Sequence, residues 1–231
     1  MSKYKTVFFD LDHTIWDFET NAKLTLKDLF SAALAEKVNA PFDDFFERYS
    51  YHNTLLWSKY EKGLIPVEEL KWKRMSRTLL DFKIADEELS KQMSKDFLEI
   101  LPTKKEIFPH TFEILEYLKS KNYGLHLITN GFIEVQNRKL ENSGLDKYFD
   151  EMITSERSNS LKPKPEIFEY ALQVTNANKA ESIMIGDNQH ADIGGALNFG
   201  IDAVFVNHIK ESITVTPTFV IEHLKELETI L

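Results

Sequence analysis

The sequence contains no cysteine, no excess of positive charge and no long hydrophobic run. The absence of cysteine from all 231 residues excludes disulfides, thiolate metal sites and cysteine nucleophiles. A formal net charge of −9 argues against a nucleic-acid groove, which needs a basic face. No apolar segment approaches the length that crosses a bilayer, and no signal-like segment precedes the first strand-like residues. We therefore expect a cytoplasmic monomer or homodimer that binds neither nucleic acid nor a membrane.

The most informative stretch is residues 4–14, YKTVFFDLDHT. Its apolar, β-branched and aromatic residues are typical of a strand, and this strand ends in Asp10 and Asp12. Side chains of a strand alternate between faces, so the two carboxylates project to one side if the extended geometry persists. Two acids at the end of a buried strand are costly unless a cation lies between them, and Mg²⁺ prefers carboxylate oxygen. The alternative is a strand that simply ends in a polar turn.

Residues 16–100 contain no convincing strand and several helical patterns. Apolar side chains recur at helical spacing over residues 25–38, and Pro41 and Pro66 each suit the start of a further helix. Leu89, Met93 and Phe97 form one more apolar stripe. With 42% hydrophobic and 28% charged residues, the chain is ordinary for a globular protein and long enough for a core plus an accessory domain. We read this segment as a helical insert.

From residue 103 onward, strand-like and helix-like segments alternate. We expect strands over residues 123–129, 149–153, 181–186, 202–206 and 218–220. We expect helices over residues 111–121, 133–143, 165–175, 191–199 and 221–231. This alternation predicts an α/β protein with a doubly wound, Rossmann-like parallel sheet. The domains are then a core of residues 1–15 and 101–231 and a helical domain of residues 16–100.

The carboxyl ends of the predicted strands gather the polar residues, and these ends are where such sheets bind ligands. Asp10 and Asp12 follow the first strand, Thr129-Asn130-Gly131 closes the second, and Asp187 follows the fourth. Lys162 lies in the segment Lys162-Pro163-Lys164-Pro165 before the next helix. A hydroxyl beside backbone N–H groups and a lysine can hold a phosphate, and an aspartate can attack phosphorus. A second aspartate can exchange a proton with the leaving oxygen and then with water.

Four segments in this order resemble the haloacid dehalogenase superfamily of phosphatases. They are Asp10-Leu11-Asp12-His13-Thr14, Leu127-Ile128-Thr129-Asn130, Lys162-Pro163-Lys164-Pro165, and Gly186-Asp187 with Asp192. The resemblance spans nearly the whole chain and implies that residues 16–100 are a cap domain. It also implies Mg²⁺-dependent hydrolysis of a small phosphate ester through an aspartyl phosphate.

The resemblance assigns a role to each site residue. Asp10 is the nucleophile and Asp12 the general acid and base. Mg²⁺ is held by the Asp10 carboxylate, the Asp12 main-chain carbonyl and Asp187, while Asp192 supports the site without binding the metal. The residues that the resemblance assigns to phosphate binding are Thr129, Asn130, Gly131 and Lys162.

A narrower likeness connects the chain to pyrimidine 5'-nucleotidases. It rests on residues 56–63 (LWSKYEKG), residues 128–132 (ITNGF), and residues 153–156 (ITSE) followed by Lys162-Pro163. The substrate is then a nucleoside 5'-monophosphate. Most of the superfamily has glycine at the position of His13, so His13 either contacts substrate or is a solvated loop residue. Aromatic side chains that could stack on a base, or belong to the core instead, are Phe18, Trp57, Tyr60 and Phe132.

Two other functions remain open from the sequence, and a third, dehalogenation, is disfavoured. The shared core fits a sugar-phosphate or phosphoglycolate phosphatase or a phosphomutase equally well, because specificity lies in the cap. Dehalogenation does not need an acid at position 12. A non-enzymatic phosphoacceptor module would keep Asp10 phosphorylated for a long time, whereas Asp12 is placed to activate water.

Overall fold

The computed structural model describes residues 3–231, which contain a six-stranded sheet with the order β3-β2-β1-β4-β5-β6. All five neighbouring pairs are parallel. This confirms the predicted α/β fold. The strands are β1 (Thr6–Phe9), β2 (Gly124–Thr129), β3 (Glu151–Thr154), β4 (Ser182–Gly186), β5 (Asp202–Val206) and β6 (Phe219–Ile221).

Strand β1 lies inside the sheet, between β2 and β4. Phe9 pairs with Leu127 on one side and with Ile185 on the other, so the three strands end close together. Val7, Phe8 and Phe9 are completely buried. Burial on both faces explains why the strand is a continuous apolar run rather than an alternating one. The polar residues that follow are thereby brought to one edge of the sheet.

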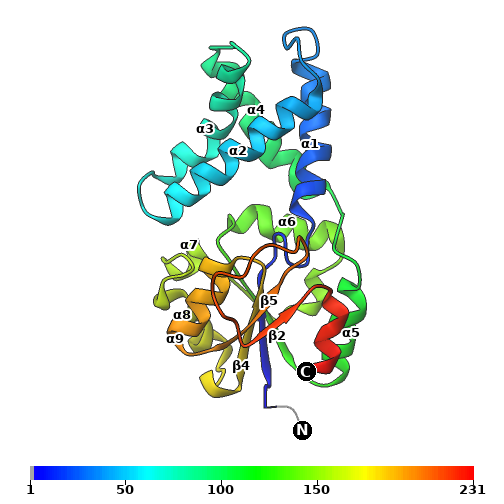
Figure 1. The fold of residues 1–231 in the computed structure, drawn as a ribbon, viewed down its shortest axis with the longest axis vertical. Coiled ribbons are helices and arrows are strands. Elements are labelled where there is room, and N and C mark those ends of the chain that lie inside the picture. Colours follow the sequence, from blue (N-terminus) through cyan, green and yellow to red (C-terminus); the bar gives the residue numbers. More distant parts are fainter. Residues whose placement is uncertain (1–2) are drawn as a thin grey trace. The chain divides into compact units, whose positions relative to one another are not determined.

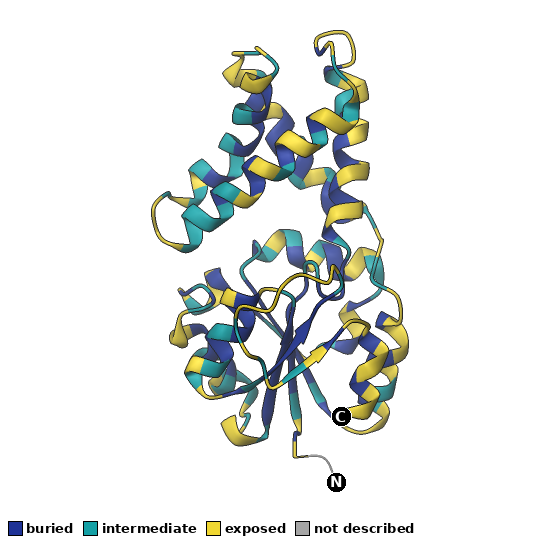
Figure 2. Ribbon diagram, viewed as in Figure 1, coloured by how far each residue is buried: buried dark blue, intermediate teal, exposed yellow. Residues whose placement is uncertain are grey.

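Helices cover both faces of this sheet (Figure 1). Helices α8 (Pro165–Thr175) and α9 (Gly195–Phe199) lie on one side, where Phe168 packs with Phe8 and Met184 in the main core cluster. Helix α5 (Thr111–Ser120) lies on the other side with the C-terminal segment. Helix α6 (Ile133–Ser143) follows β2, and the short α7 (Ser155–Ser158) follows β3. Burial is concentrated in the strands and on the inner sides of these helices (Figure 2).

Residues 191–199 do not form the single helix that the apolar pattern predicts. A π-helical turn, η4 (Gln189–Gly194), comes first and α9 follows it. The Asn188 side chain accepts hydrogen bonds from the N–H groups of His190 and Ala191, which starts the turn two residues earlier than expected. Asp192 lies in this π-helical turn and is buried.

The predicted final helix over residues 221–231 is also wrong. Strand β6 continues to Ile221, and a 3₁₀ helix, η5 (Leu224–Thr229), follows. The Glu226 side chain accepts hydrogen bonds from the N–H groups of Glu222 and His223 and closes a tight capping box. Leu224 and Leu227 are buried three residues apart, which is the period of a 3₁₀ helix.

Residues 19–104 form a second compact unit, separate from the unit of residues 3–18 and 105–231. Its boundaries lie a few residues beyond those predicted from the sequence. The unit contains α2 (Phe42–Glu61), α3 (Val67–Asp81), α4 (Glu87–Ile100) and most of α1 (Phe18–Ala33), with the short η1 (Leu101–Thr103) after α4. Helix α1 begins at Phe18 rather than Thr25, because Asn21 and Ala22 extend its buried face toward the N-terminus.

The core of this helical unit is aromatic. The Phe45 ring lies between the rings of Phe30 and Phe82, at centroid distances of 5.3 and 5.7 Å. Tyr49 contacts Phe97 at 5.3 Å. Helices α2 and α3 begin directly after Pro41 and Pro66, as the sequence predicts. Among residues 3–231, no helix combines the length and the apolar character needed to cross a membrane.

Candidate active site

Lys162 is the centre of a buried ionic cluster at the carboxyl edge of the sheet. Its ammonium Nζ lies 2.5 Å from Asp10 Oδ1 and 2.7 Å from Asp192 Oδ1, and it donates to the carbonyl of Ile128 at 2.6 Å. Only 2% of Lys162 is exposed. A buried charge is tolerated when it is paired and hydrogen-bonded in this way. The charged residues Asp10, Lys162 and Asp192 are far apart in sequence, and the fold brings them together.

Asn130 fixes the loop that carries Lys162. Its Oδ1 accepts a hydrogen bond from the Lys162 N–H at 2.9 Å, and its Nδ2 donates to the Lys162 carbonyl at 3.1 Å. The side chain of Asn130 is therefore engaged with the backbone of Lys162.

The carboxylates of this cluster have perturbed proton affinities. Removal from water raises the pKa of Asp10 well above its ordinary range, although the Lys162 charge opposes this effect. Burial, reinforced by the nearby Asp192 charge, raises the pKa of Asp187 to about 8. Burial acts to lower the pKa of Lys162, but the charges of Asp10 and Asp192 outweigh it and hold this pKa above its ordinary value. A cation would relieve the repulsion among the acids.

The donor set fits a hard divalent cation. Carboxylate oxygens of Asp10, Asp187 and Asp192 all lie within 4.8 Å of one another. One oxygen of Asp10 and one of Asp187 accept hydrogen bonds from Lys162 and from the Thr14 hydroxyl, and each carboxylate keeps lone pairs that could bind a cation. Asp192 binds Lys162 through Oδ1 and accepts from the Asn188 N–H at 3.0 Å through Oδ2. Its two oxygens are thus both hydrogen-bonded.

Thr129 is buried at the end of β2, with its hydroxyl as an acceptor. It accepts from the Gly131 N–H at 3.1 Å and from Gln136 Nε2 at 2.8 Å. Because the hydroxyl oxygen accepts both bonds, its own hydrogen remains available as a donor. The geometry suits donation to an anionic oxygen placed at the end of the strand.

Asp12 has two partners that the sequence analysis does not identify. Lys139 Nζ lies 2.6 Å from Asp12 Oδ1, and Gln136 Nε2 donates to Oδ2 at 2.9 Å. Both partners come from α6, directly after the Thr129-Asn130-Gly131 turn. A polar pair three residues apart on the buried side of an amphipathic helix was the available signal.

The proposed specificity residues fall in both units. His13 has φ of 64°, the left-handed region where glycine is usual, and its ring lies 5.0 Å from that of Phe18. Phe18 and Phe132 are buried, whereas Trp57 and Tyr60 are half-buried on α2 with their rings 5.8 Å apart. The structure therefore places His13, Phe18 and Phe132 in the unit of Asp10, and Trp57 and Tyr60 in the helical unit.

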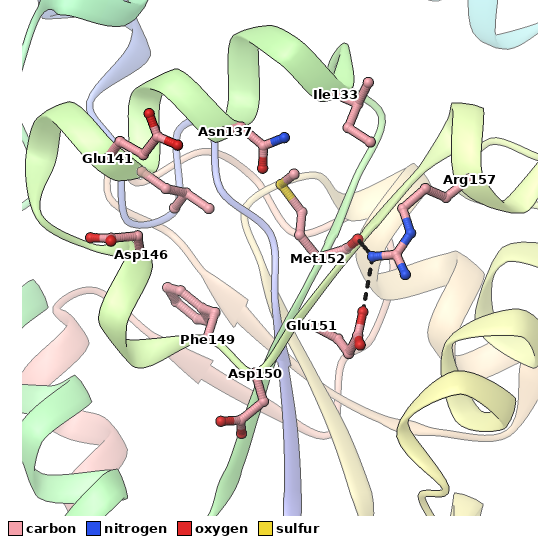
Figure 3. Close-up of a pocket in the computed structure, with 10 residues that line it drawn as sticks. Ile133, Asn137, Glu141, Asp146, Phe149, Asp150, Glu151, Met152 and Arg157 are labelled. Carbon is pink, nitrogen blue, oxygen red and sulfur yellow. Dashed lines mark hydrogen bonds and ion pairs between the residues drawn. The ribbon is translucent and has the colours of Figure 1, made fainter.

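A cavity of about 400 Å³ lies elsewhere, between α6 and β3, and none of the predicted site residues lines it (Figure 3). Arg157, which lines it, donates to Glu151 and to the Met152 carbonyl. The other charged residues of its wall are acidic: Glu141, Asp146 and Asp150. This excess of negative charge disfavours a phosphate ester.

Comparison with known proteins identifies relatives along the whole chain. A family model described as haloacid dehalogenase-like hydrolase matches residues 4–200. The HAD-hydrolase YfnB of Bacillus subtilis is 32% identical over 236 residues, covering 100% of this chain and 97% of YfnB. A crystal structure of YfnB bound to magnesium, which reveals interdomain movement, matches with a TM-score of 0.90 and 27% identity. This match covers 100% of the present chain and 99% of that structure.

Two further relatives are pyrimidine 5'-nucleotidases. PynA of Streptococcus pneumoniae is 30% identical, covering 97% of this chain and 93% of PynA. YjjG of Escherichia coli is 30% identical, covering 99% of this chain and 98% of YjjG. More distant relatives include a glyceraldehyde 3-phosphate phosphatase and the pyrophosphatase PpaX.

Proposed function

The chain belongs to the haloacid dehalogenase-like hydrolases, and from this premise we propose that it is a Mg²⁺-dependent phosphomonoesterase acting on a nucleoside 5'-monophosphate. The observation that carries the proposal is the buried contact of Lys162 with Asp10, close to the acids Asp187 and Asp192. A carboxylate held beside an ammonium group and next to a cation site can meet a phosphate dianion without prohibitive repulsion.

The reaction has two steps. A carboxylate oxygen of Asp10 attacks phosphorus, the bond from phosphorus to the ester oxygen breaks, and Asp12 gives that oxygen a proton. Water then attacks phosphorus, Asp12 accepts a proton from the water, and the phosphorus–Asp10 bond breaks to release phosphate. Mg²⁺, held by the carboxylates of Asp10 and Asp187 and the main-chain carbonyl of Asp12, would supply positive charge to the transferring group.

Phosphate recognition follows from the donors at the strand ends. The Thr129 hydroxyl and the Asn130-Gly131 turn bind the phosphate oxygens, the Gly131 N–H by leaving its present bond to Thr129. The three ammonium hydrogens of Lys162 meet Asp10, Asp192 and the Ile128 carbonyl, so Lys162 contributes its positive charge. Asp192 orients Lys162 through their ion pair and is not a metal ligand. The second carboxylate oxygen of Asp192 accepts a hydrogen bond from the Asn188 N–H, which agrees with a role in orienting Lys162.

The nucleotide preference is supported by the two pyrimidine 5'-nucleotidases that match nearly the full chain. The helical unit acts as the cap that selects the substrate, and the interdomain movement of YfnB supports a mobile cap. Within the helical unit the candidate base contacts are Trp57 and Tyr60, and within the unit of Asp10 they are His13, Phe18 and Phe132. A sugar-phosphate phosphatase is the second candidate, favoured by the match to a glyceraldehyde 3-phosphate phosphatase.

The test is phosphate release from a panel of nucleoside 5'-monophosphates, sugar phosphates and phosphoglycolate in the presence of Mg²⁺, with chloride release from 2-chloropropionate measured in parallel. We expect a preference for pyrimidine monophosphates that disappears in Asp10→Asn and in EDTA. Activity on sugar phosphates alone would keep the mechanism and overturn the nucleotide preference. Release of chloride but no phosphate would overturn the phosphatase assignment.

A further inference from the structure

Helix α6 presents two hydrogen-bond donors to the carboxylate of Asp12. Lys139 Nζ contacts Oδ1 at 2.6 Å and Gln136 Nε2 contacts Oδ2 at 2.9 Å. Each oxygen of the carboxylate is thus held by a different side chain. Lys139 and Gln136 are 2% and 0% exposed. Two buried polar side chains converging on one carboxylate restrict both its position and the rotation of its plane.

The surroundings of Lys139 allow its ammonium little freedom. It lies 4.4 Å from the centroid of the Trp16 ring and 5.6 Å from that of Phe18. Aromatic faces attract a cation but give it no hydrogen-bond acceptor of carboxylate strength. Asp12 supplies a carboxylate counter-ion to this buried ammonium.

Gln136 connects Asp12 to the phosphate-binding turn. Its Nε2 donates to Asp12 Oδ2 and to Thr129 Oγ1. The reverse amide orientation would place Oε1 against the carboxylate, so these contacts define the orientation of the side chain. A Cβ at Gly131 would lie 2.3 Å from this Nε2, which shows that the turn is fitted closely to the amide.

We propose that Lys139 and Gln136 are positioning residues that hold the Asp12 carboxylate for proton transfer. This inference rests on the proposed function, in which Asp12 gives a proton to the leaving oxygen. Each carboxylate oxygen has two lone pairs, and the contacts with α6 use one on each. The remaining lone pairs can carry the transferred proton. The two side chains therefore direct Asp12 toward the ester oxygen without themselves touching the substrate.

The proposal is tested with two esters that differ in their need for a proton. A nucleoside 5'-monophosphate releases an alkoxide, which requires protonation, whereas p-nitrophenyl phosphate releases a stable phenolate. The measured quantity is kcat/KM, which reports the steps up to departure of the leaving group. In Lys139→Met we expect kcat/KM to fall about 30-fold for the nucleotide and less than about threefold for p-nitrophenyl phosphate.

Two further variants support the comparison. Lys139→Arg keeps the positive charge and should recover part of the nucleotide activity. Lys147→Met is the matched control, because Lys147 also lies over an aromatic ring, that of Tyr148, but is exposed. We expect both of its kcat/KM values to stay at the wild-type level.

An equal fall in kcat/KM for both esters, or no fall, would overturn the proposal. If thermal melts show that Lys139→Met does not fold, Gln136→Met decides by the same ratio between the two esters. Failure of the proposed function has a different signature, because the wild-type protein would then not hydrolyse the nucleotide. Wild-type activity with an unchanged ratio in the variants would overturn the positioning role alone.

Discussion

Gly186, the last residue of β4, leaves room for the carboxylate of Asp192. A Cβ at this position would lie 2.3 Å from Asp192 Oδ2, and Asp192 is only 1% exposed. The neighbour cannot move aside without breaking its ion pair with Lys162. The requirement for glycine at this position is therefore steric, and φ there does not lie in the left-handed region.

We predict that Gly186→Ala lowers the free energy of unfolding by about 2–3 kcal/mol, the usual cost of overpacking a core. Activity should fall with it, because Lys162 loses its alignment. The measurements are urea denaturation and phosphate release. Gly144→Ala is the control, since Gly144 has φ of +72° but open space around it. It should cost about 1 kcal/mol and keep its activity. Wild-type stability and activity in Gly186→Ala would contradict this account.

At the scale of single residues, the sequence predicts the groups at the strand ends and misses their partners on α6. Asp10 and Asp187 stand out because they directly follow apolar strands, and Lys162 stands out by the Lys162-Pro163-Lys164-Pro165 segment before a helix. Gln136 and Lys139 lie on the face of α6 that the helical period assigns to the core. Whether a polar residue on such a face binds the Asp12 carboxylate depends on the packing of distant segments, which the local pattern does not contain.

At the scale of elements, the loop after β5 is held by one side chain of the π-helical turn. Gln189 Nε2 donates to Glu211 Oε1 at 2.6 Å and to the Ser212 carbonyl at 2.9 Å. Its Oε1 accepts from the N–H groups of Thr214 and Val215 at 2.6 and 3.2 Å. This network replaces the hydrogen bonds that a regular strand or helix would provide over residues 211–215.

We predict that Gln189→Ala loosens this loop and lowers the free energy of unfolding by about 2 kcal/mol, because the loop loses the hydrogen bonds that this side chain makes. Amide hydrogen exchange should become faster at residues 211–215. Gln92→Ala is the control, since Gln92 is exposed and its side chain donates a hydrogen bond to Asp96. Unchanged exchange at residues 211–215 in Gln189→Ala would show that other contacts hold the loop.

The order and type of the elements were largely predictable, but two of their geometries were not. Alternating apolar runs and helical periods indicate all six strands and the helices α5, α6 and α8. The π-helical turn depends on the Asn188 side chain, and η5 depends on Glu226, so each is decided by one local hydrogen-bonding group. Hydrophobic periodicity carries no information about such groups.

At the scale of the whole molecule, two compact units share one chain, and the acidic cluster belongs to only one of them. A ligand stabilises the unit that binds it. A net charge of −9 also means that any salt will screen repulsion across the surface. Metal binding and general screening must therefore be separated.

We predict that Mg²⁺ at ten times its Kd stabilises the unit of residues 3–18 and 105–231 by about 1.4 kcal/mol. For a chain of this size the Tm should rise by about 3–6 °C. The Tm is measured by calorimetry in Mg²⁺, in EDTA and in NaCl of matched ionic strength. Asp187→Asn should abolish the response to Mg²⁺ and keep the response to NaCl. An equal rise in Mg²⁺ and NaCl would contradict a specific metal site.

The central claim is that Asp10 carries the phosphoryl group for a short time. The direct measurement is mass spectrometry of the protein, acid-quenched during turnover of p-nitrophenyl phosphate with Mg²⁺. We expect phosphate on the peptide that contains Asp10, disappearing once substrate is consumed and accumulating in Asp12→Asn, where water is no longer activated. Turnover with no phosphorylated peptide, or with phosphate on another residue, would contradict the claim. A phosphorylated Asp10 that persists in the wild-type protein without turnover would identify a phosphoacceptor module instead.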